Sequence, residues 1–288
     1  MTAIYKREVK SYFHSMVGYV FIAFLVAFTG IYFMAFNLNQ GYPYFSYVLS
    51  ATQFIFLIAV PILTMRSFAE EKKNKTDQLL LTAPVSLGRI VIGKYLAMIT
   101  ILAVPCVIYL IFPLIIRTQG TAYILVDYLS ILVFFLMGCV YIAIGMFVSS
   151  LTDSTAIAAI GAFGILILLH LWDGLLNFLP SAAWANMIGI VLLASLTAAG
   201  MWQMTGSRGI GAVTEVVLLT AAGGIYLVKP AVFENALKGI LGRFRLAEAF
   251  SSISSNRLLD VSGIILYLTL IGLFIFLTMQ MIQKRRWS

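Results

Sequence analysis

The chain has 288 residues, of which 61% are hydrophobic and only 10% are charged. Soluble domains carry about a quarter of charged residues, and disordered chains combine low hydrophobicity with high charge, so this composition excludes both classes. The net charge of +8 does not indicate a nucleic-acid partner, because the bases do not cluster on one predicted surface. We expect an all-α integral membrane protein whose solvent is mostly lipid.

The first segment, 2–14, predicts an amphipathic interfacial helix, because apolar side chains recur on one helical face and bases occupy the other. The alternative is a basic flank of the first span. The apolar run that follows has 22 residues, longer than the about 7–15 of a signal peptide, so no cleaved signal is expected. The apolar face contains Tyr5, Val9, Tyr12, Phe13 and Met16, and the polar face contains Lys6, Arg7, Lys10 and His14.

Membrane spans are predicted wherever about 20 consecutive residues are uncharged and mostly apolar. A further uncharged stretch begins at 174 and is broken at Pro180, and we interpret 185–229 as an inserted hairpin of two more spans, near 185–204 and 209–228. Glu215 weakens the second of these. The prediction is therefore about eight spans, or six plus a re-entrant hairpin. The six clearer spans are 16–37, 48–65, 95–116, 128–152, 154–172 and 261–283.

The loop charges predict the orientation of these spans. With the N-terminus inside, the inner segments carry thirteen Lys and Arg residues and the outer segments carry six. Inner loops of membrane proteins are enriched in these bases, so both termini are expected in the cytoplasm and 1–288 is expected to form one transmembrane domain. The outer segment 230–260 is predicted to be amphipathic, with an apolar face on the outer leaflet or over an outer opening; this face contains Leu237, Ile240, Leu241 and Phe244.

Catalytic signatures are absent from the sequence. Neither HExxH nor GxSxG occurs, and the P-loop-like run 88–95 has Tyr95 where magnesium binding needs Ser or Thr. We therefore expect no enzyme activity, no metal and no bound cofactor. His170 and Asp173, three residues apart on one predicted helix face, are possible pathway residues together with Glu215. The alternative for each is a structural role near the membrane surface.

The loop 66–94 is the one long inner loop. An acidic pair, Glu70 and Glu71, stands among bases and is followed by a predicted short apolar helix, 76–81. Pro84 ends this helix, and Ser86 is positioned to cap the next one. Exposed leucines on so short a helix favour docking of a partner protein, and the alternative is that the helix lies flat on the inner leaflet.

The residues of this loop resemble the cytoplasmic coupling region of membrane subunits of type-2 ATP-binding-cassette exporters. One departure is Lys75, where that family usually has glycine. The run Ile-Gly-Met-Phe-Val-Ser-Ser-Leu-Thr at 144–152 is also similar to the family, and the tail from Phe244 to Trp287 resembles its gliding-motility branch. The similarity covers 1–180 and 240–288. The matching loop positions are Glu70, Glu71, Thr76, Leu79 to Leu81, Pro84 to Ser86 and Gly93 to Leu96.

This resemblance implies a permease subunit of an exporter in the bacterial cytoplasmic membrane. A separate ATPase subunit would bind ATP and magnesium and dock on the loop, and the pathway would need a second copy of this chain or a homologous permease. An extracytoplasmic accessory protein is a further possible partner, and the cargo is not specified. The rival hypothesis is a secondary transporter driven by an ion gradient through His170, Asp173 and Glu215. The implied coupling residues are Glu70, Glu71, Thr76, Leu79, Leu80, Leu81, Pro84, Val85 and Ser86.

Overall fold

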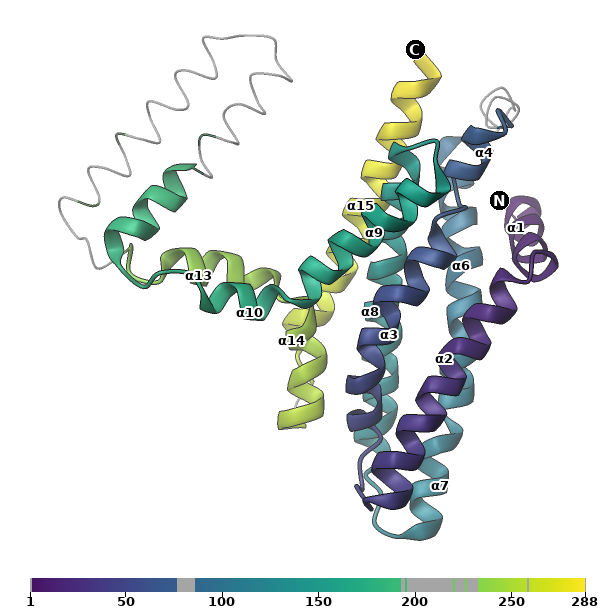
Figure 1. Ribbon diagram of the computed structural model, residues 1–288, viewed down its shortest axis with the longest axis vertical. Helices are drawn as coiled ribbons and strands as arrows, with labels where there is room; N and C mark the ends of the chain where they lie inside the picture. The colour runs from purple at the N-terminus through teal and green to yellow at the C-terminus, as the bar shows by residue number, and fades with distance from the viewer. Residues whose placement is uncertain are drawn as a thin grey trace. The chain divides into compact units, whose positions relative to one another are not determined.

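The computed structural model describes residues 2–76, 86–192, 195, 220, 226, 233–257 and 259–287. This part of the chain is helical and contains no strand, which confirms the predicted all-α class. The chain forms two compact units, Met1–His170 with Leu246–Ser288, and Leu171–Arg245. We refer to them as the main unit and the second unit, and describe each by itself (Figure 1).

The main unit is a bundle of long apolar helices with short helices at its ends (Figure 1). Its elements in chain order are α1 (Thr2–His14), α2 (Val17–Phe33), η1 (Met34–Asn39), α3 (Ser46–Thr64), α4 (Ala69–Lys73), α6 (Leu87–Tyr109), α7 (Ile111–Gln119), α8 (Ile124–Leu151), α9 (Thr155–His170), α14 (Leu246–Ser251), η4 (Ser252–Asn256) and α15 (Val261–Trp287).

Five stretches among the described residues are long and apolar enough to cross a membrane: Val17–Asn39, Ser46–Lys73, Leu87–Gln119, Ile124–Leu151 and Val261–Arg285. They correspond to five of the six clearer predicted spans. The sixth, 154–172, forms the shorter apolar helix α9, which has 16 residues and ends at His170. Most of the predicted pair at 185–229 lies outside the described residues, so the count of eight stays a prediction.

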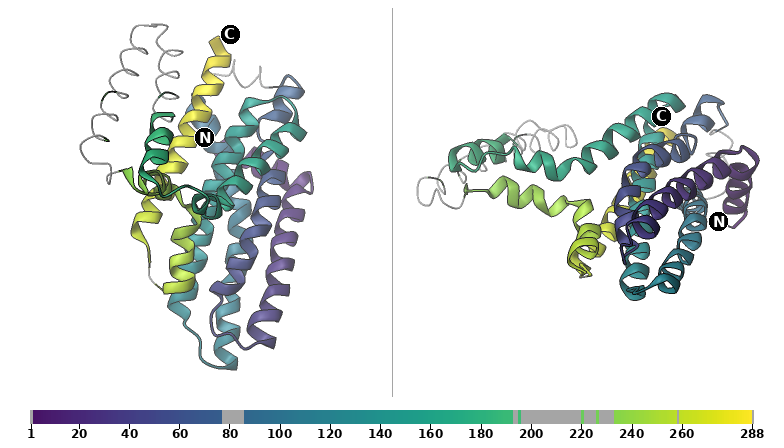
Figure 2. Two further views of the ribbon diagram at one scale, coloured as in Figure 1. Left: turned by 60° about the vertical axis from the view of Figure 1, so that its left-hand side comes forward. Right: turned by 60° about the horizontal axis from the view of Figure 1, so that its bottom comes forward.

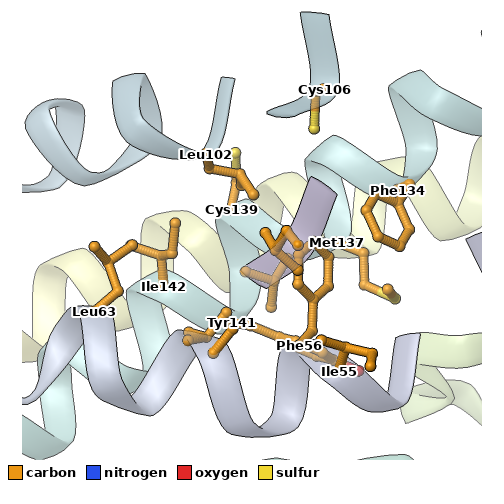
Figure 3. Close-up of a cluster of buried hydrophobic side chains, with 14 of the residues drawn as sticks. Ile55, Phe56, Leu63, Leu102, Cys106, Phe134, Met137, Cys139, Tyr141 and Ile142 are labelled. Atoms are coloured by element: carbon orange, nitrogen blue, oxygen red, sulfur yellow. The ribbon is translucent and has the colours of Figure 1, made fainter. Parts of the chain in front are cut away.

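The core of the main unit lies around α8. The most apolar windows of α8 and α3 are 78% and 67% buried, whereas that of α15 is 17% buried. α8 packs against α3, α6, α9 and α15. Aromatic rings fill the centre, where Phe56 of α3 stacks on Phe134 of α8 with ring centroids 4.4 Å apart (Figure 3). The sparsely buried helices have their apolar surfaces available for lipid or another subunit.

Both chain termini and α4 lie at one end of the main unit, and the loops 40–45 and 120–123 lie at the opposite end (Figures 1 and 2). We call these the terminal end and the far end. Ion pairs connect the parts of the terminal end: Arg7 of α1 with Glu71 of α4, and Arg285 of α15 with Asp153. The described ends of the chain and the start of the loop 66–94 therefore lie at one end of the bundle (Figure 1), and their side of the membrane stays a prediction.

The predicted helix 2–14 is present as α1, with its four basic or histidine positions exposed. Its apolar face packs against α6 of the same chain, where the Tyr5 hydroxyl lies 2.9 Å from Thr100 Oγ1. Met16 was predicted on this face, but it is 73% exposed and has φ +60°. That left-handed residue ends α1 and redirects the chain into α2, so Met16 leaves the face. Glu8 is buried beside Tyr12 instead.

The second unit contains α10 (Trp172–Asn177), the helix Ala183–Leu192, α13 (Ala236–Leu241) and η3 (Gly242–Phe244). Helical structure in the predicted amphipathic segment is therefore present over 236–244. Leu237 is buried against its own chain: its N–H donates to Asn186 Oδ1 at 3.1 Å, and a Cβ built on Gly189 would lie 2.3 Å from its side chain. Ile240 is exposed and remains available for a leaflet.

We expect Gly145→Ala to destabilise the bundle, because a Cβ at this position would lie 2.3 Å from Thr64 Oγ1 on α3. Overpacking of this kind costs about 1–3 kcal/mol. The matched control is Gly164→Ala on α9, where no atom lies within 4 Å of the added Cβ. Thermal unfolding of the purified protein in detergent should show a lower Tm for Gly145→Ala only. Equal melting of the two variants would contradict a tight α3–α8 contact.

Candidate functional site

The chain bends sharply between α3 and α4, and one serine holds the bend. Ser149 of α8 is buried. Its Oγ donates to Met65 O at 3.1 Å and accepts the N–H groups of Phe68 and Ala69 at 3.2 and 3.1 Å. A hydroxyl has one donor and two acceptor sites, so its bonding capacity is fully used. Ser149 belongs to the run 144–152 that carried the family resemblance, and it fastens α4 to the central helix.

A group of four charges, in which Lys94 and Glu8 are buried and Arg7 is exposed, connects α4 to α1 and α6. Lys94, in the second turn of α6, is 2% exposed, and its Nζ lies 2.8 Å from Glu71 Oε1 and 3.2 Å from Glu8 Oε1. Arg7 Nη2 lies 2.7 Å from the same Glu8 oxygen and 3.4 Å from the same Glu71 oxygen. Two bases and two acids therefore balance. We call these four residues the charge cluster.

Lys94 and Glu8 depend on their partners, because burying a charge without a partner costs several kcal/mol and pairing offsets that cost. Lys94 also has its ammonium 5.3 Å from the centre of the Phe68 ring, a favourable cation–π distance. Within the cluster, the hydrogen bond to Glu8 raises the pKa of Arg7, and beside it burial raises the pKa of Tyr12. Arg7 thus stays charged and Tyr12 stays neutral at physiological pH.

A cavity of about 300 Å³ opens beside the charge cluster, between α1 and the start of the loop. Its lining combines the cluster with further polar side chains of α1, of the bend and of the turn after α4. These further side chains are Ser11, Ser15, Arg66, Glu70, Asn74 and Thr76. The cavity can therefore admit a polar or charged group of a partner without exposing the bundle core.

A second set of contacts connects α4 to the ends of α8 and α15. Lys72 Nζ donates to the Ser150 carbonyl oxygen and lies 4.0 Å from Asp153 Oδ1. Arg285, near the end of α15, donates to the same Asp153 oxygen at 3.0 Å. Asp153 is well exposed, so the arginine pair contributes little stability, about 0–1 kcal/mol. Asp153 nevertheless connects the last turns of α15 with Lys72 of α4.

Through Ala69, Glu71 and Lys72, α4 is thus bonded to α1, α6 and α8, and through Asp153 to α15. Hydrogen bonds and ion pairs of this kind transmit a displacement because they fix the distances between the elements they join. A force applied to the loop that follows α4 would therefore act on four helices, three of which are candidate spans. We call α4, Ser149, Asp153 and the charge cluster the α4 junction.

Glu70 and Glu71, which the sequence analysis assigned to the same coupling site, have different surroundings in the structure. Glu71 is held inside the charge cluster, where its carboxylate contacts Lys94 and Arg7. The side chain of Glu70 is 47% exposed, and its Oε2 lies 4.0 Å from Nε of Arg66, one turn earlier. It remains available to a partner. Helical geometry explains the difference, since successive residues of α4 point about 100° apart.

The remaining predicted loop residues are described in part. Thr76 donates its hydroxyl to Glu71 O at 3.3 Å, which closes the turn after α4. Ser86 occupies the N-cap position of α6 as predicted, but its side chain makes no capping hydrogen bond. Lys75 has φ +56°, a left-handed conformation that favours glycine, which gives a physical reason for the usual glycine of the resembling family. Leu79, Leu80, Leu81, Pro84 and Val85 lie outside the described residues.

The intramembrane polar residues do not form the predicted pair on one helix face. α9 ends at His170 and α10 begins at Trp172, so His170 and Asp173 belong to different helices. The His170 ring has an edge-to-face contact with Phe54, 6.3 Å between centroids. Asp173 pairs with Arg245 at 3.1 Å within the second unit. Glu215 lies outside the described residues.

Sequence reasoning missed Glu8 and assigned Lys94 no partner within the chain. Two signals could have identified them. Glu8 lies three residues after Tyr5 and four before Tyr12, on the apolar face of α1, where a carboxylate needs a base. Lys94 is followed by apolar residues for more than five helical turns, so its charge needs an acid nearby. Only the fold shows that Glu71 completes the cluster.

Comparison with known families now bears on this geometry. A family model described as ABC-2 family transporter protein matches residues 2–281, nearly the whole chain. The chain belongs to the ABC-2 transporter family. Comparison with curated proteins and with solved structures gives no match. The family and the apolar helices together show a multi-pass membrane protein that serves as the membrane component of an ABC transporter. The gliding-motility branch stays a prediction.

In this ABC-2 protein, Lys94→Met should be strongly destabilising, because it removes the buried base and leaves Glu8 and Glu71 with only the exposed Arg7 as a partner. Breaking a buried ion pair from one side costs about 3–5 kcal/mol. Adding Glu8→Gln and Glu71→Gln should recover much of the loss, because the uncompensated acids are then neutral. Thermal unfolding in detergent gives the readout, with exposed Lys10→Met as the control that melts like the wild type. If Lys94→Met also melted like the wild type, the charge cluster would have no energetic role.

Proposed function

We propose that this chain is the permease subunit of an ABC exporter and that a separate ATPase drives it through the α4 junction. The observation that supports this proposal is the bonding of α4 to four helices of the bundle. In such a transporter the ATPase binds and hydrolyses ATP with magnesium, and the permease itself performs no catalysis. ABC-2 family membership supports the assignment of ATP hydrolysis to a separate subunit.

The loop 66–94 is the proposed docking element. Leu79, Leu80 and Leu81 would anchor it, since each leucine contributes about 1.5–3 kcal/mol when fully enclosed. Thr76, Pro84, Val85 and Ser86 would shape the loop around these anchors. Glu70, the exposed acid of α4, would pair with a base of the ATPase and fix the register of the interface. Glu71 is assigned a different role: it positions Lys94 inside the permease.

The contacts of α4 suggest how movement of the ATPase would reach the spans. Closure of the ATPase subunits would displace the loop, and the loop would displace α4. Because Glu71 holds Lys94 and Ser149 holds the bend before α4, α6 and α8 would tilt with it. α1 would follow through Glu8. The apolar faces of α2 and α15 have little cover within this chain, so a second permease copy or a homologue has room to complete the pathway.

The orientation that suits this mechanism places the terminal end in the cytoplasm, as the excess of inner-loop bases also favours. We further propose eight spans, with the pair at 185–229 inserted into a six-span plan, and location in the bacterial cytoplasmic membrane. The far end would then face outward. We also propose that an extracytoplasmic accessory protein engages the segment 230–260, which the loop charges predict to be an outer segment. The rival mechanism, an ion-gradient transporter using His170 and Asp173, draws no support from a shared helix face.

A coupling experiment tests the proposal. The permease is coexpressed with an ATPase subunit of the same transporter, and copurification and ATPase rate are measured in nanodiscs. We expect Leu80→Asp to abolish copurification, because a carboxylate removes an apolar anchor. Thr121→Asp, exposed at the far end, is the matched control and should retain the ATPase. Glu71→Gln should retain the ATPase but alter its rate, because the docked loop no longer holds Lys94. Retention of the ATPase by Leu80→Asp would contradict the docking assignment.

A further inference from the structure

An arginine at the far end of the main unit lies over two stacked tyrosines. The rings of Tyr44 and Tyr123 are nearly parallel, 15° apart, with centroids separated by 4.6 Å. The guanidinium carbon of Arg257 lies 4.3 Å from the centroid of the Tyr44 ring and 5.6 Å from that of Tyr123. Such distances give a favourable cation–π contact. We call these three residues the arginine platform.

The backbone around the arginine platform is tied down from several helices. Asp127 of α8 accepts the N–H of Phe45 at 2.8 Å, and Asn37 donates to Tyr44 O at 3.1 Å. Ser254, three residues before Arg257, lies 2.9 Å from Ser50 of α3, hydroxyl to hydroxyl. Arg257 itself has φ +60°, which ends η4 and turns the chain toward α15. The platform is therefore held in place by the fold.

The arginine platform lies just before the first residues of three candidate spans, where we expect these helices to enter the membrane. Tyr44 comes two residues before α3, Tyr123 directly precedes α8, and Arg257 comes four residues before α15. All three helices are candidate spans. Tyrosines at this level are typical of the interface between lipid tails and headgroups. The phosphate groups of phospholipids occupy the same level.

The N–H donors of the Arg257 guanidinium remain available for hydrogen bonds, although its face is stacked on the tyrosines. Stacking uses the face of the planar group, whereas its five N–H donors lie in the plane. In the part of the chain that the structure describes, no carboxylate, carbonyl or hydroxyl is bonded to these donors, and Arg257 is exposed. An arginine held by its face and open at its edge matches the bidentate geometry of an oxyanion, phosphate above all.

We propose that the arginine platform is a binding site for a phosphate group at the far end of the bundle. The phosphate can belong to the headgroup of an anionic phospholipid or to a soluble phosphorylated molecule. Arg257 supplies the charge and the paired donors, while Tyr44 and Tyr123 hold its plane. This site is independent of the α4 junction, so it stands whether or not an ATPase docks at the terminal end.

The test measures binding to the full-length chain by native mass spectrometry after delipidation in detergent. One arm titrates phosphatidylglycerol, with diacylglycerol as the lipid that lacks phosphate, and the other arm titrates inorganic phosphate. We expect Arg257→Gln to weaken phosphate-dependent binding at least about tenfold, because hydrogen bonds to charged groups are lost. Arg117→Gln is the matched control: Arg117 is exposed at the same end, and no aromatic contact to it occurs among the described residues. It should bind like the wild type.

Two further variants distinguish a role of Arg257 in phosphate binding from a role in stabilising the loops of the far end. Arg257→Lys keeps the charge but not the planar pair of donors, and Tyr44→Leu keeps Arg257 but removes its support; both should weaken binding while the protein stays monodisperse. Binding of phosphatidylglycerol alone identifies a lipid site, and Arg257-dependent binding of inorganic phosphate identifies a site for a soluble ligand. Equal binding by wild type and Arg257→Gln in both arms would overturn the proposal.

Discussion

The Lys94 ammonium is the constraint on which the terminal end of the protein depends. It is buried in the second turn of a membrane-spanning helix. Burying a charge without partners there costs roughly several kcal/mol of folding free energy. Glu71 and Glu8 supply the partners from two other helices. As long as Lys94 stays buried, α1 and α4 must therefore stay beside α6. One ion thus couples a surface helix, a loop helix and a span.

The central helix α8 supplies the complementary constraint. Gly145 allows α3 to approach closely enough for Thr64 to contact the α8 backbone, and Ser149, one turn later, bonds the bend that leads into α4. Close packing and hydrogen bonding therefore act on consecutive turns of one helix face. Such spacing of small residues is typical of helix contacts in membranes. α4 is fixed from α8 on one side and from Lys94 on the other.

Hydropathy predicts most of the fold here because a span needs only length and apolar composition. Five predicted spans and the helix 2–14 are present, whereas α9 is shorter than predicted because it ends at His170. The charge cluster was beyond prediction, since Glu8, Glu71 and Lys94 are far apart in sequence and only the packing of α1 on α6 brings them together. The contacts of Glu71 with Lys94 and Arg7 likewise depend on packing between elements that are distant in sequence.

The most direct test asks whether α1 and α4 move as one body. Spin labels at Lys10→Cys and Asn74→Cys, both exposed, report the distance between α1 and the turn after α4 by pulsed electron paramagnetic resonance. We expect the same distance distribution in the nucleotide-free complex and in the complex trapped with ATP, because the charge cluster holds both elements through the cycle. A distance that changes by several ångströms, or a second population with bound ATP, would show that the cluster opens and would contradict rigid transmission through Lys94.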